Sequence, residues 1–299
     1  MPWLQLVRWQ NLLIIFLTQL LAWWCVVMPQ SPAILNLFNF CCLALSTVLI
    51  AAAGYIINDY FDIKIDTINK PGKVVLEKII PRKQAIIAHA LLNTIALLLA
   101  GYVAAQAHHY EWLLLQAVCS LLLWFYSTDF KRQYITGNVV VAILTALTIL
   151  ILIIYEPAMH QFSKAVLLIY AYFAFMLTWM REIVKDMEDH IGDEAGGCIT
   201  MPVKKGLDYS ARFSIALSLL VILPLGLASV VLFTYHYQWL SVYVAAVLIA
   251  PLIWWSVFLV RNSTTRHYHN ARRGLKIIML LGICSLIIYH LQLFATRVA

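Results

Sequence analysis

Two stretches of the chain carry three aspartates each, at the same spacing. They are Asp59, Asp62 and Asp66 in the first stretch, and Asp186, Asp189 and Asp193 in the second. In an α-helix, residues at i, i+3 and i+7 share one face, so each stretch would present three carboxylates together. Like charges on one helical face repel by roughly 0.2–0.5 kcal/mol per pair, and a bound cation would relieve that repulsion.

The chemistry of these side chains favours a hard divalent cation. All six groups offer oxygen ligands, which suit Mg²⁺ or Mn²⁺. Protein-bound Mg²⁺ usually combines one or two carboxylates with waters and substrate phosphate oxygens. Two such faces could therefore clamp one diphosphate, and we predict that all six aspartates are catalytic and bind metal. The alternative is that each triplet is a solvated acidic helix end, which does not explain why the pattern occurs twice.

Basic residues flank both acidic stretches. Positive side chains that share a site with bound Mg²⁺ can neutralise a departing diphosphate. We predict this catalytic role for Lys131 and Lys185, and substrate binding for Lys73, Arg181 and Lys204. The alternative for any one of them is an ordinary basic residue on the cytoplasmic side of a membrane protein.

The composition places these motifs in a membrane protein. Of the 299 residues, 63% are hydrophobic and 12% are charged, whereas a water-soluble domain carries about 25% charged residues. Apolar segments of about 20 residues are needed to cross about 30 Å of hydrocarbon, and we find nine candidates. They are Leu12–Met28, Ala33–Ile57, Ala85–Ala104, Trp112–Tyr126, Val139–Tyr155, Ala165–Met180, Phe213–Phe233, Leu240–Val260 and Leu275–Leu293. A backbone in lipid must satisfy its own hydrogen bonds, so we predict an all-α bundle of nine transmembrane helices, as one domain over residues 1–299.

The charged residues gather on one side of this predicted bundle. All of the 21 Lys and Arg residues except Lys164 and Arg297 lie there, and so do all of the 14 acidic residues except Glu111 and Glu156. The positive-inside rule makes this side cytoplasmic, with the N-terminus inside and the C-terminus outside a cell (inner) membrane. The formal net charge of +7 thus belongs to the cytoplasmic face, where we expect the active site. No nucleic-acid-binding module accompanies the charge, so membrane lipids and an anionic substrate are the expected partners.

The chain resembles the UbiA-type intramembrane prenyltransferases over most of its length. The similar motifs are an RxxN stretch at Arg8–Asn11, an NDxxDxxxD stretch at Asn58–Asp66, an NxPxK stretch at Asn69–Lys73, a YS…K…GN stretch at Tyr126–Asn138, and a DxxDxxxD stretch at Asp186–Asp193. The resemblance implies a Mg²⁺-dependent transfer of an isoprenyl group from its diphosphate to an acceptor, through ionisation of the allylic C–O bond. It also implies that Arg8, Asn11, Asn58 and Tyr126 bind substrate. No protein partner is implied.

A further resemblance, over a longer stretch of sequence, indicates the acceptor. Residues 181–202 resemble the corresponding sequence in the digeranylgeranylglyceryl phosphate synthase branch of this family. This resemblance implies that the acceptor is geranylgeranylglyceryl phosphate. Lys73 occupies a position where many members of the family have Arg, and residues 74–78 lack the usual RPLPSG motif. An aromatic acceptor of the quinone or tocopherol type is therefore the alternative. An acceptor with its own phosphate would need further cations. We interpret the basic stretch Arg266–Arg273 as a topology determinant or a lipid-headgroup contact.

A different class of function is a transporter for an anionic lipid or metabolite. Transporters usually place ionisable residues near the membrane midplane, on interrupted helices. Here these residues are predicted at helix ends and in loops, which favours the enzyme.

Overall fold

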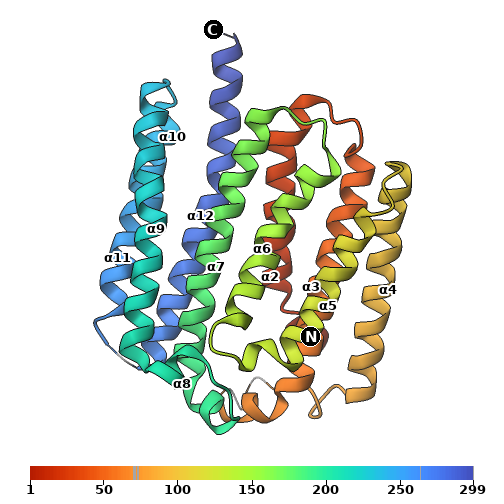
Figure 1. Cartoon of the computed structure of the whole chain (residues 1–299), viewed down its shortest axis with the longest axis vertical. Coiled ribbons are helices and arrows are strands. Elements are labelled where there is room, and N and C mark those ends of the chain that lie inside the picture. The colour runs from red at the N-terminus through yellow and green to blue at the C-terminus, as the bar shows by residue number, and fades with distance from the viewer. Residues whose placement is uncertain (70–71, 73, 263, 299) are drawn as a thin grey trace.

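The structure is a computed structural model that describes residues 1–69, 72, 74–262 and 264–298, and it is built from helices (Figure 1). The α-helices are α1 (Pro2–Leu6), α2 (Trp9–Ala22), α3 (Leu37–Asn69), α4 (Arg82–Gln106), α5 (Trp112–Thr128), α6 (Thr136–Tyr155), α7 (Gln161–Ala195), α8 (Met201–Lys205), α9 (Leu207–Thr234), α10 (Gln238–Tyr243), α11 (Ala250–Leu259) and α12 (Thr265–Val298). Shorter helical turns of other types are η1 (Trp23–Val27), η2 (Met28–Gln30), η3 (Phe130–Arg132) and η4 (Val244–Ile249). This agrees with the predicted all-α class.

The predicted membrane spans coincide with these helices. Among the described residues, eight helices are long and apolar enough to cross a membrane, and the remaining predicted span, Trp112–Tyr126, is the shorter apolar helix α5, of 17 residues. The start of one helix falls inside its predicted span: the second span was predicted from Ala33, but α3 begins at Leu37. Just before α3, the backbone N–H groups of residues 33–35 donate hydrogen bonds to the carboxylate of Glu156. The chain is an integral, multi-pass membrane protein.

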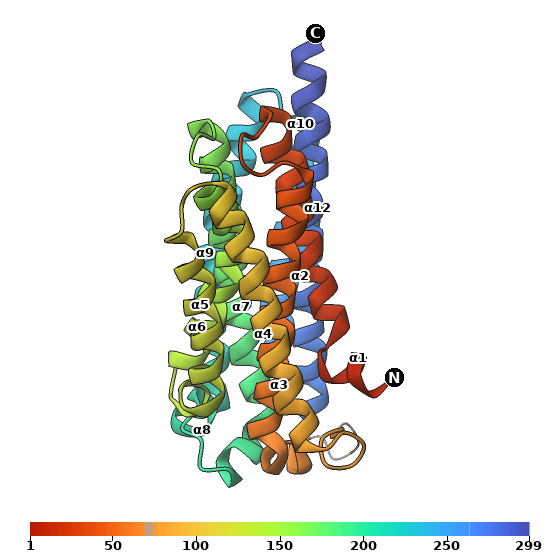
Figure 2. The same ribbon diagram turned by 90° about the vertical axis from the view of Figure 1, so that its right-hand side faces the viewer.

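The long helices run side by side along the longest axis of the molecule. The N-terminus lies toward one end of the bundle and the C-terminus at the other, with α8 at the end nearer the N-terminus (Figures 1 and 2). Helix α7 packs against α3, α6, α9 and α12, so it contacts both the N-terminal and the C-terminal part of the chain. Its buried residues form one apolar core with those of its neighbours.

Helices α3 and α7 are longer than a membrane requires. They have 33 and 35 residues, and a helix of that length extends about 50 Å against about 30 Å of hydrocarbon. Their last turns carry the two aspartate triplets, as the sequence predicted. Both helices end at the same end of the bundle, the lower end in Figure 1.

A direct clasp joins the ends of these two helices. The Asn69 side chain donates to the backbone carbonyl of Asp189 at 3.0 Å and accepts from the backbone N–H of Gly192 at 2.9 Å. A Cβ atom at Gly192 would lie 2.4 Å from Asn69 Oδ1, and one at Gly196 would lie 2.7 Å from the side chain of Ile65. Glycine at both positions therefore allows the two helix ends to touch.

Candidate active site

A cavity of about 280 Å³ lies between the ends of α3 and α7. It is lined by all six aspartates of the two triplets: Asp59, Asp62, Asp66, Asp186, Asp189 and Asp193. We call it the acidic cavity. Residues more than 120 positions apart in the chain thus share one small space, as expected if the two faces hold a common ligand.

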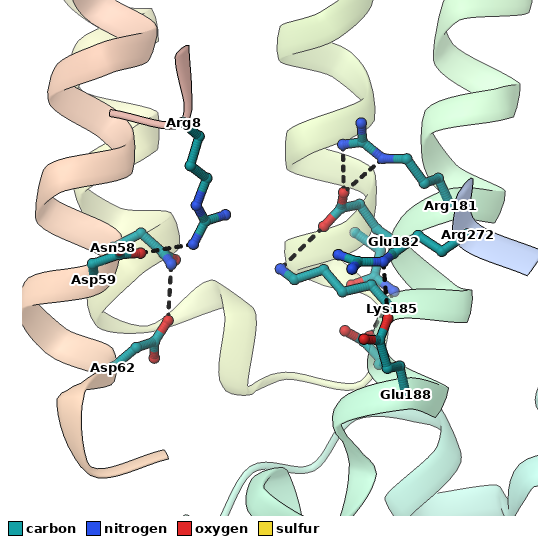
Figure 3. A network of polar contacts seen from close by, with 11 residues as sticks. Arg8, Asn58, Asp59, Asp62, Arg181, Glu182, Lys185, Glu188 and Arg272 are labelled. Carbon is teal, nitrogen blue, oxygen red and sulfur yellow. Dashed lines mark hydrogen bonds and ion pairs between the residues drawn. The ribbon is translucent and has the colours of Figure 1, made fainter. Parts of the chain in front are cut away.

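Basic and amide side chains hold the first triplet in place. Arg8 Nη2 donates to Asp59 Oδ1 at 2.7 Å, and Asn58 Nδ2 donates to Asp62 Oδ2 at 2.9 Å (Figure 3). The Lys131 ammonium forms a further ion pair with Asp62, and both side chains are largely buried. The pairs of Asp59 with Arg8 and of Asp62 with Lys131 join different parts of the N-terminal half around the acidic cavity, and the Asn58–Asp62 bond lies within α3.

The Lys131 side chain reaches Asp62 because the loop before α6 folds tightly. A Cβ atom at Gly137 would lie 2.7 Å from Lys131 Cα and 2.8 Å from the Phe130 carbonyl oxygen, so only glycine fits there. The next residue, Asn138, donates to Asp186 Oδ2 at 2.9 Å. The predicted YS…K…GN stretch thus contacts both acidic helices.

Arg8 occupies an unusual backbone conformation between α1 and α2. Its φ of 52° and ψ of 54° are left-handed, a region that non-glycine residues seldom adopt. Burial opposes the charge of its guanidinium, but Asp59, Tyr55 and Asp66 together raise the pKa of Arg8 above its ordinary value. The guanidinium also lies 5.0 Å from the centroid of the Tyr55 ring. Arg8 is therefore a fixed positive charge at the rim of the acidic cavity.

The donor set of the acidic cavity fits Mg²⁺. Among the described residues, no three His, Cys, Asp or Glu side chains are close enough together to form a ready-made metal cage. Mg²⁺ does not require one, because it commonly binds through one or two carboxylates, waters and substrate phosphates. In addition, Asn58 lines the cavity, and its buried Oδ1 atom has no hydrogen-bond donor among the described residues. The cavity therefore offers carboxylate and amide oxygens of the kind a hard cation binds.

A second cavity, of about 790 Å³, adjoins the first and is called the large cavity. Part of its wall is apolar and comes from α2, α3, α5 and α6. The apolar residues include Ile15, Ile50, Leu115, Leu123, Val141, Leu144, Leu147 and Ile151. This volume and lining suit a long hydrocarbon chain.

The other wall of the large cavity is charged and comes from α7 and α12. Glu182 accepts from Arg181 at 2.6 Å and from Lys185 at 3.4 Å, and the carboxyl group is almost fully buried (Figure 3). Near it, Glu188 pairs with Arg272 at 2.9 Å and with His269 at 2.9 Å. In Figure 3 these groups face Arg8 and Asn58 across the space between α7 and α3.

The predicted site residues are distributed over the two cavities as follows. Arg8, Asn11, Asn58, Tyr126 and Lys185 line both. Arg181 lines the large cavity and Lys131 the acidic one.

One predicted residue is not brought to the site. Lys204 lines neither cavity; it is exposed on α8, with its ammonium 5.1 Å from the centroid of the Tyr134 ring. It follows the second acidic stretch closely in sequence, but the turn after α7 carries it away. Lys73 lies outside the described residues.

Several charged residues at the site were not predicted. They are Glu182, Glu188, His269, Arg272, Arg273 and Lys276, which pair across the site or line the large cavity. Arg272 and Arg273 belong to the basic stretch interpreted as a topology determinant, and the structure brings both to the large cavity. The signal in the sequence was the spacing of Arg272, Arg273 and Lys276, which places all three within about one turn of a helix.

Comparison with protein families and curated proteins gives a consistent set of relatives. A model of the UbiA prenyltransferase family matches residues 12–292. A digeranylgeranylglyceryl phosphate synthase of Ignicoccus hospitalis is 31% identical over 82% of this chain and 80% of that protein. One of Methanosphaera stadtmanae is 28% identical over 95% of this chain and 97% of that protein.

Solved structures share the fold. A structure described as concerning digeranylgeranylglyceryl phosphate synthase in membranes superposes with a TM-score of 0.67 and 24% identity, covering 97% of this chain and 98% of that chain. A UbiA homolog from Archaeoglobus fulgidus, bound to DMAPP and Mg²⁺, superposes with a TM-score of 0.58 and 16% identity, covering 96% and 99%. The nine predicted spans thus belong to a known arrangement of helices.

Proposed function

The chain belongs to the UbiA prenyltransferase family, and from this premise we propose that it transfers a geranylgeranyl group from its diphosphate to geranylgeranylglyceryl phosphate, with Mg²⁺ as cofactor. The curated relatives named above carry the name digeranylgeranylglyceryl phosphate synthase, which supports this donor and acceptor. The neighbouring structure with DMAPP and Mg²⁺ supports an isoprenyl diphosphate donor and this metal. Mn²⁺, with similar ligand preferences, is the alternative metal.

The observation that carries the proposal is that the two cavities adjoin. Arg8, Asn11, Asn58, Tyr126 and Lys185 line both. A diphosphate bound in the acidic cavity can therefore extend its hydrocarbon chain along the apolar wall of the large one. The reacting C–O bond would lie at the junction, beside these shared residues.

The six aspartates are the proposed metal-binding residues. Asp59, Asp62 and Asp66 would act from α3, and Asp186, Asp189 and Asp193 from α7. When bound, Mg²⁺ neutralises the diphosphate and so favours its departure. The amide of Asn58 offers a further oxygen at the same place.

The chain's own cations would stabilise the negative charge that develops on the leaving diphosphate. Lys131 is fixed by its pair with Asp62, Arg8 by its bond to Asp59, and Lys185 by its bond to Glu182. Charges held in place before the reaction need little reorganisation during it. The phenol ring of Tyr126 lines both cavities, where an aromatic face can attract the allylic cation.

The orientation in the membrane is part of the proposal. The basic end of the bundle would face the cytoplasm, with the N-terminus inside and the C-terminus outside the cell (inner) membrane. The N-terminus and the C-terminus lie toward opposite ends of the structure, which fits an odd number of membrane crossings (Figure 1). We further propose that residues 1–299 act as one domain, since the structural match covers 97% of the chain.

A panel of acceptors tests the proposed function. Purified protein would be incubated with labelled geranylgeranyl diphosphate, Mg²⁺ and either geranylgeranylglyceryl phosphate or an aromatic acceptor such as homogentisate. We expect a doubly prenylated glyceryl phosphate, formed only with divalent metal and lost on chelation. A product from the aromatic acceptor alone would reverse the choice of acceptor, and no transfer to any acceptor would refute the enzyme activity.

A further inference from the structure

The wall of the large cavity formed by α7 and α12 has an excess of positive charge. The basic residues that line this cavity are Arg8, Arg181, Lys185, Arg272, Arg273 and Lys276, and its only acidic lining residue in the described chain is Glu182. The acidic cavity has the opposite balance, with six aspartates and four basic residues, Arg8, Lys131, Lys185 and Arg272. The two adjoining cavities thus suit ligands of different kinds.

Two of these cations have no carboxylate partner in the described part of the chain. Arg181 is paired with Glu182, and Arg272 with Glu188. Lys276 instead donates to the neutral amide oxygen of Asn11 at 2.9 Å, and Arg273 has no ion pair with any described residue. Both line the large cavity.

The cations also lie close to one another. Arg181, Arg272 and Arg273 are all near enough to Lys276 to oppose its charge. Glu182 and Glu188 balance the charges of Arg181 and Arg272, so among the described residues the charges of Arg273 and Lys276 are left to repel their neighbours unless an anion binds there. The guanidinium groups of arginine and the ammonium group of lysine can donate charge-assisted hydrogen bonds to the oxygens of a phosphate monoester.

We propose that Arg273 and Lys276, together with Arg181 and Arg272, bind the phosphate monoester of the acceptor lipid. This inference rests on the proposed function. It gives the acceptor a phosphate site of its own, on α12 and α7, apart from the carboxylates that hold the metal. The donor's diphosphate would bind together with Mg²⁺, which needs carboxylate ligands. The acceptor's phosphate would bind without a metal, so it needs positively charged side chains.

The position of the site fits a lipid that enters with its headgroup toward the cytoplasm. The lining of the large cavity includes Met1, Leu4 and Trp9 of the N-terminal segment, and the side chains of all three are exposed at the surface. An ether-linked chain could lie along such apolar groups while its phosphate contacts Arg273. An aromatic acceptor without phosphate would leave these cations without a partner.

The donor's diphosphate is the other possible source of phosphate oxygens, so the test measures both substrates. The variants are Arg273→Gln and Lys276→Gln; glutamine at 276 can still donate to Asn11. The matched control is Arg266→Gln, because Arg266 is an exposed arginine of the same helix that lines neither cavity. For each protein, KM would be measured separately for geranylgeranyl diphosphate and for geranylgeranylglyceryl phosphate.

We expect each variant at the site to raise KM for the phosphorylated acceptor about tenfold, the order of one charge-assisted hydrogen bond. KM for the donor should stay within about twofold, which also shows that the variant is folded. Arg266→Gln should change neither. In a binding measurement, wild-type protein should prefer geranylgeranylglyceryl phosphate to geranylgeranylglycerol, and Arg273→Gln should reduce that preference.

Three results would overturn the inference. An equal rise in KM for the donor would assign the cations to the diphosphate, and an unchanged acceptor KM would mean that they bind no substrate phosphate. In both cases wild-type transfer to the lipid acceptor would persist, so the proposed function would stand. If wild-type protein transferred only to aromatic acceptors, the proposed acceptor and this site would fail together.

Discussion

Asn69, the last residue of α3, holds the backbone of α7 at Gly192 through a hydrogen bond of 2.9 Å. The same side chain donates to the carbonyl of Asp189, one of the six aspartates. This clasp fixes the separation of the two acidic helix ends. The geometry of the acidic cavity therefore depends on a contact that involves no charged side chain.

Replacing Gly192 by alanine should separate the two helix ends. The new Cβ would lie 2.4 Å from Asn69 Oδ1, so the Asn69 side chain must turn away or a helix must shift, and either movement breaks the clasp. A displacement of about 1 Å at a site of this kind lowers turnover about 100-fold. Steady-state turnover with both substrates checks this. Gly226→Ala on α9 is the control, because a Cβ there meets no atom within 4 Å, and comparable losses in both variants would contradict the argument.

Removing a single carboxylate from the acidic cavity should abolish most of the activity. Asp62→Asn and Asp189→Asn keep the side-chain size but remove a metal-binding charge, and we expect turnover to fall by about 10²–10³-fold. Asp62→Asn also removes the ion-pair partner of the largely buried Lys131, so thermal stability in detergent is measured beside turnover for both variants. The matched control is Asp208→Asn, an exposed aspartate that lines neither cavity. Near-wild-type turnover in either site variant would argue against metal binding there.

The carboxylate of Glu156 should matter for stability and not for chemistry. It is 3% exposed and accepts hydrogen bonds from the backbone N–H groups of Ala33, Ile34 and Leu35, at the opposite end of the bundle. Glu156→Ala leaves these donors without a partner and should cost about 3 kcal/mol in the free energy of unfolding. Unfolding by SDS in mixed micelles measures this loss in the free energy of unfolding.

The control for Glu156 is the other acidic residue on that side of the membrane. Glu111 pairs with His109 at the surface, and Glu111→Ala should leave the unfolding midpoint unchanged. Equal effects of the two substitutions would refute the structural role given to Glu156. Both variants should retain turnover, because neither residue lines a cavity.

The thiol of Cys198 should react slowly at neutral pH. Cys198 is 4% exposed and lines the acidic cavity, and burial raises the pKa of its thiol to about 11. Because the thiolate is the reactive form, labelling should accelerate about tenfold for each unit of pH between 7 and 10. Maleimide labelling, read peptide by peptide by mass spectrometry, checks this, and unfolded protein gives the unhindered rate. Rapid labelling of the folded protein at pH 7 would contradict the burial of this thiol.

The sequence predicted those parts of the fold that depend on local patterns. Apolar segments of membrane length gave the helices, and the i, i+3, i+7 spacing placed Asp59 and Asp186 on helices that continue past the apolar region. Both signals arise within a single helix, so no knowledge of packing is needed.

Contacts between distant helices could not be predicted in the same way. Arg272 reaches Glu188, and Lys276 reaches Asn11, only because α12 packs against α7 and α2. A basic stretch after a membrane span is also expected from topology alone, which concealed its place at the large cavity. For Lys204, closeness in sequence was misleading. It follows the second acidic motif closely in the chain, but in the structure its ammonium lies beside the ring of Tyr134 and it lines neither cavity.

The residues shared by the two cavities have a thermodynamic consequence. Arg8 and Lys185 line both, so an anion bound in one cavity changes the electrostatic potential in the other. The affinities for donor and acceptor must then be linked, and the linkage is reciprocal: whatever factor the first substrate applies to the second, the second applies to the first. On the proposed function, each substrate would thus change the affinity for the other through Arg8 and Lys185, which line both cavities.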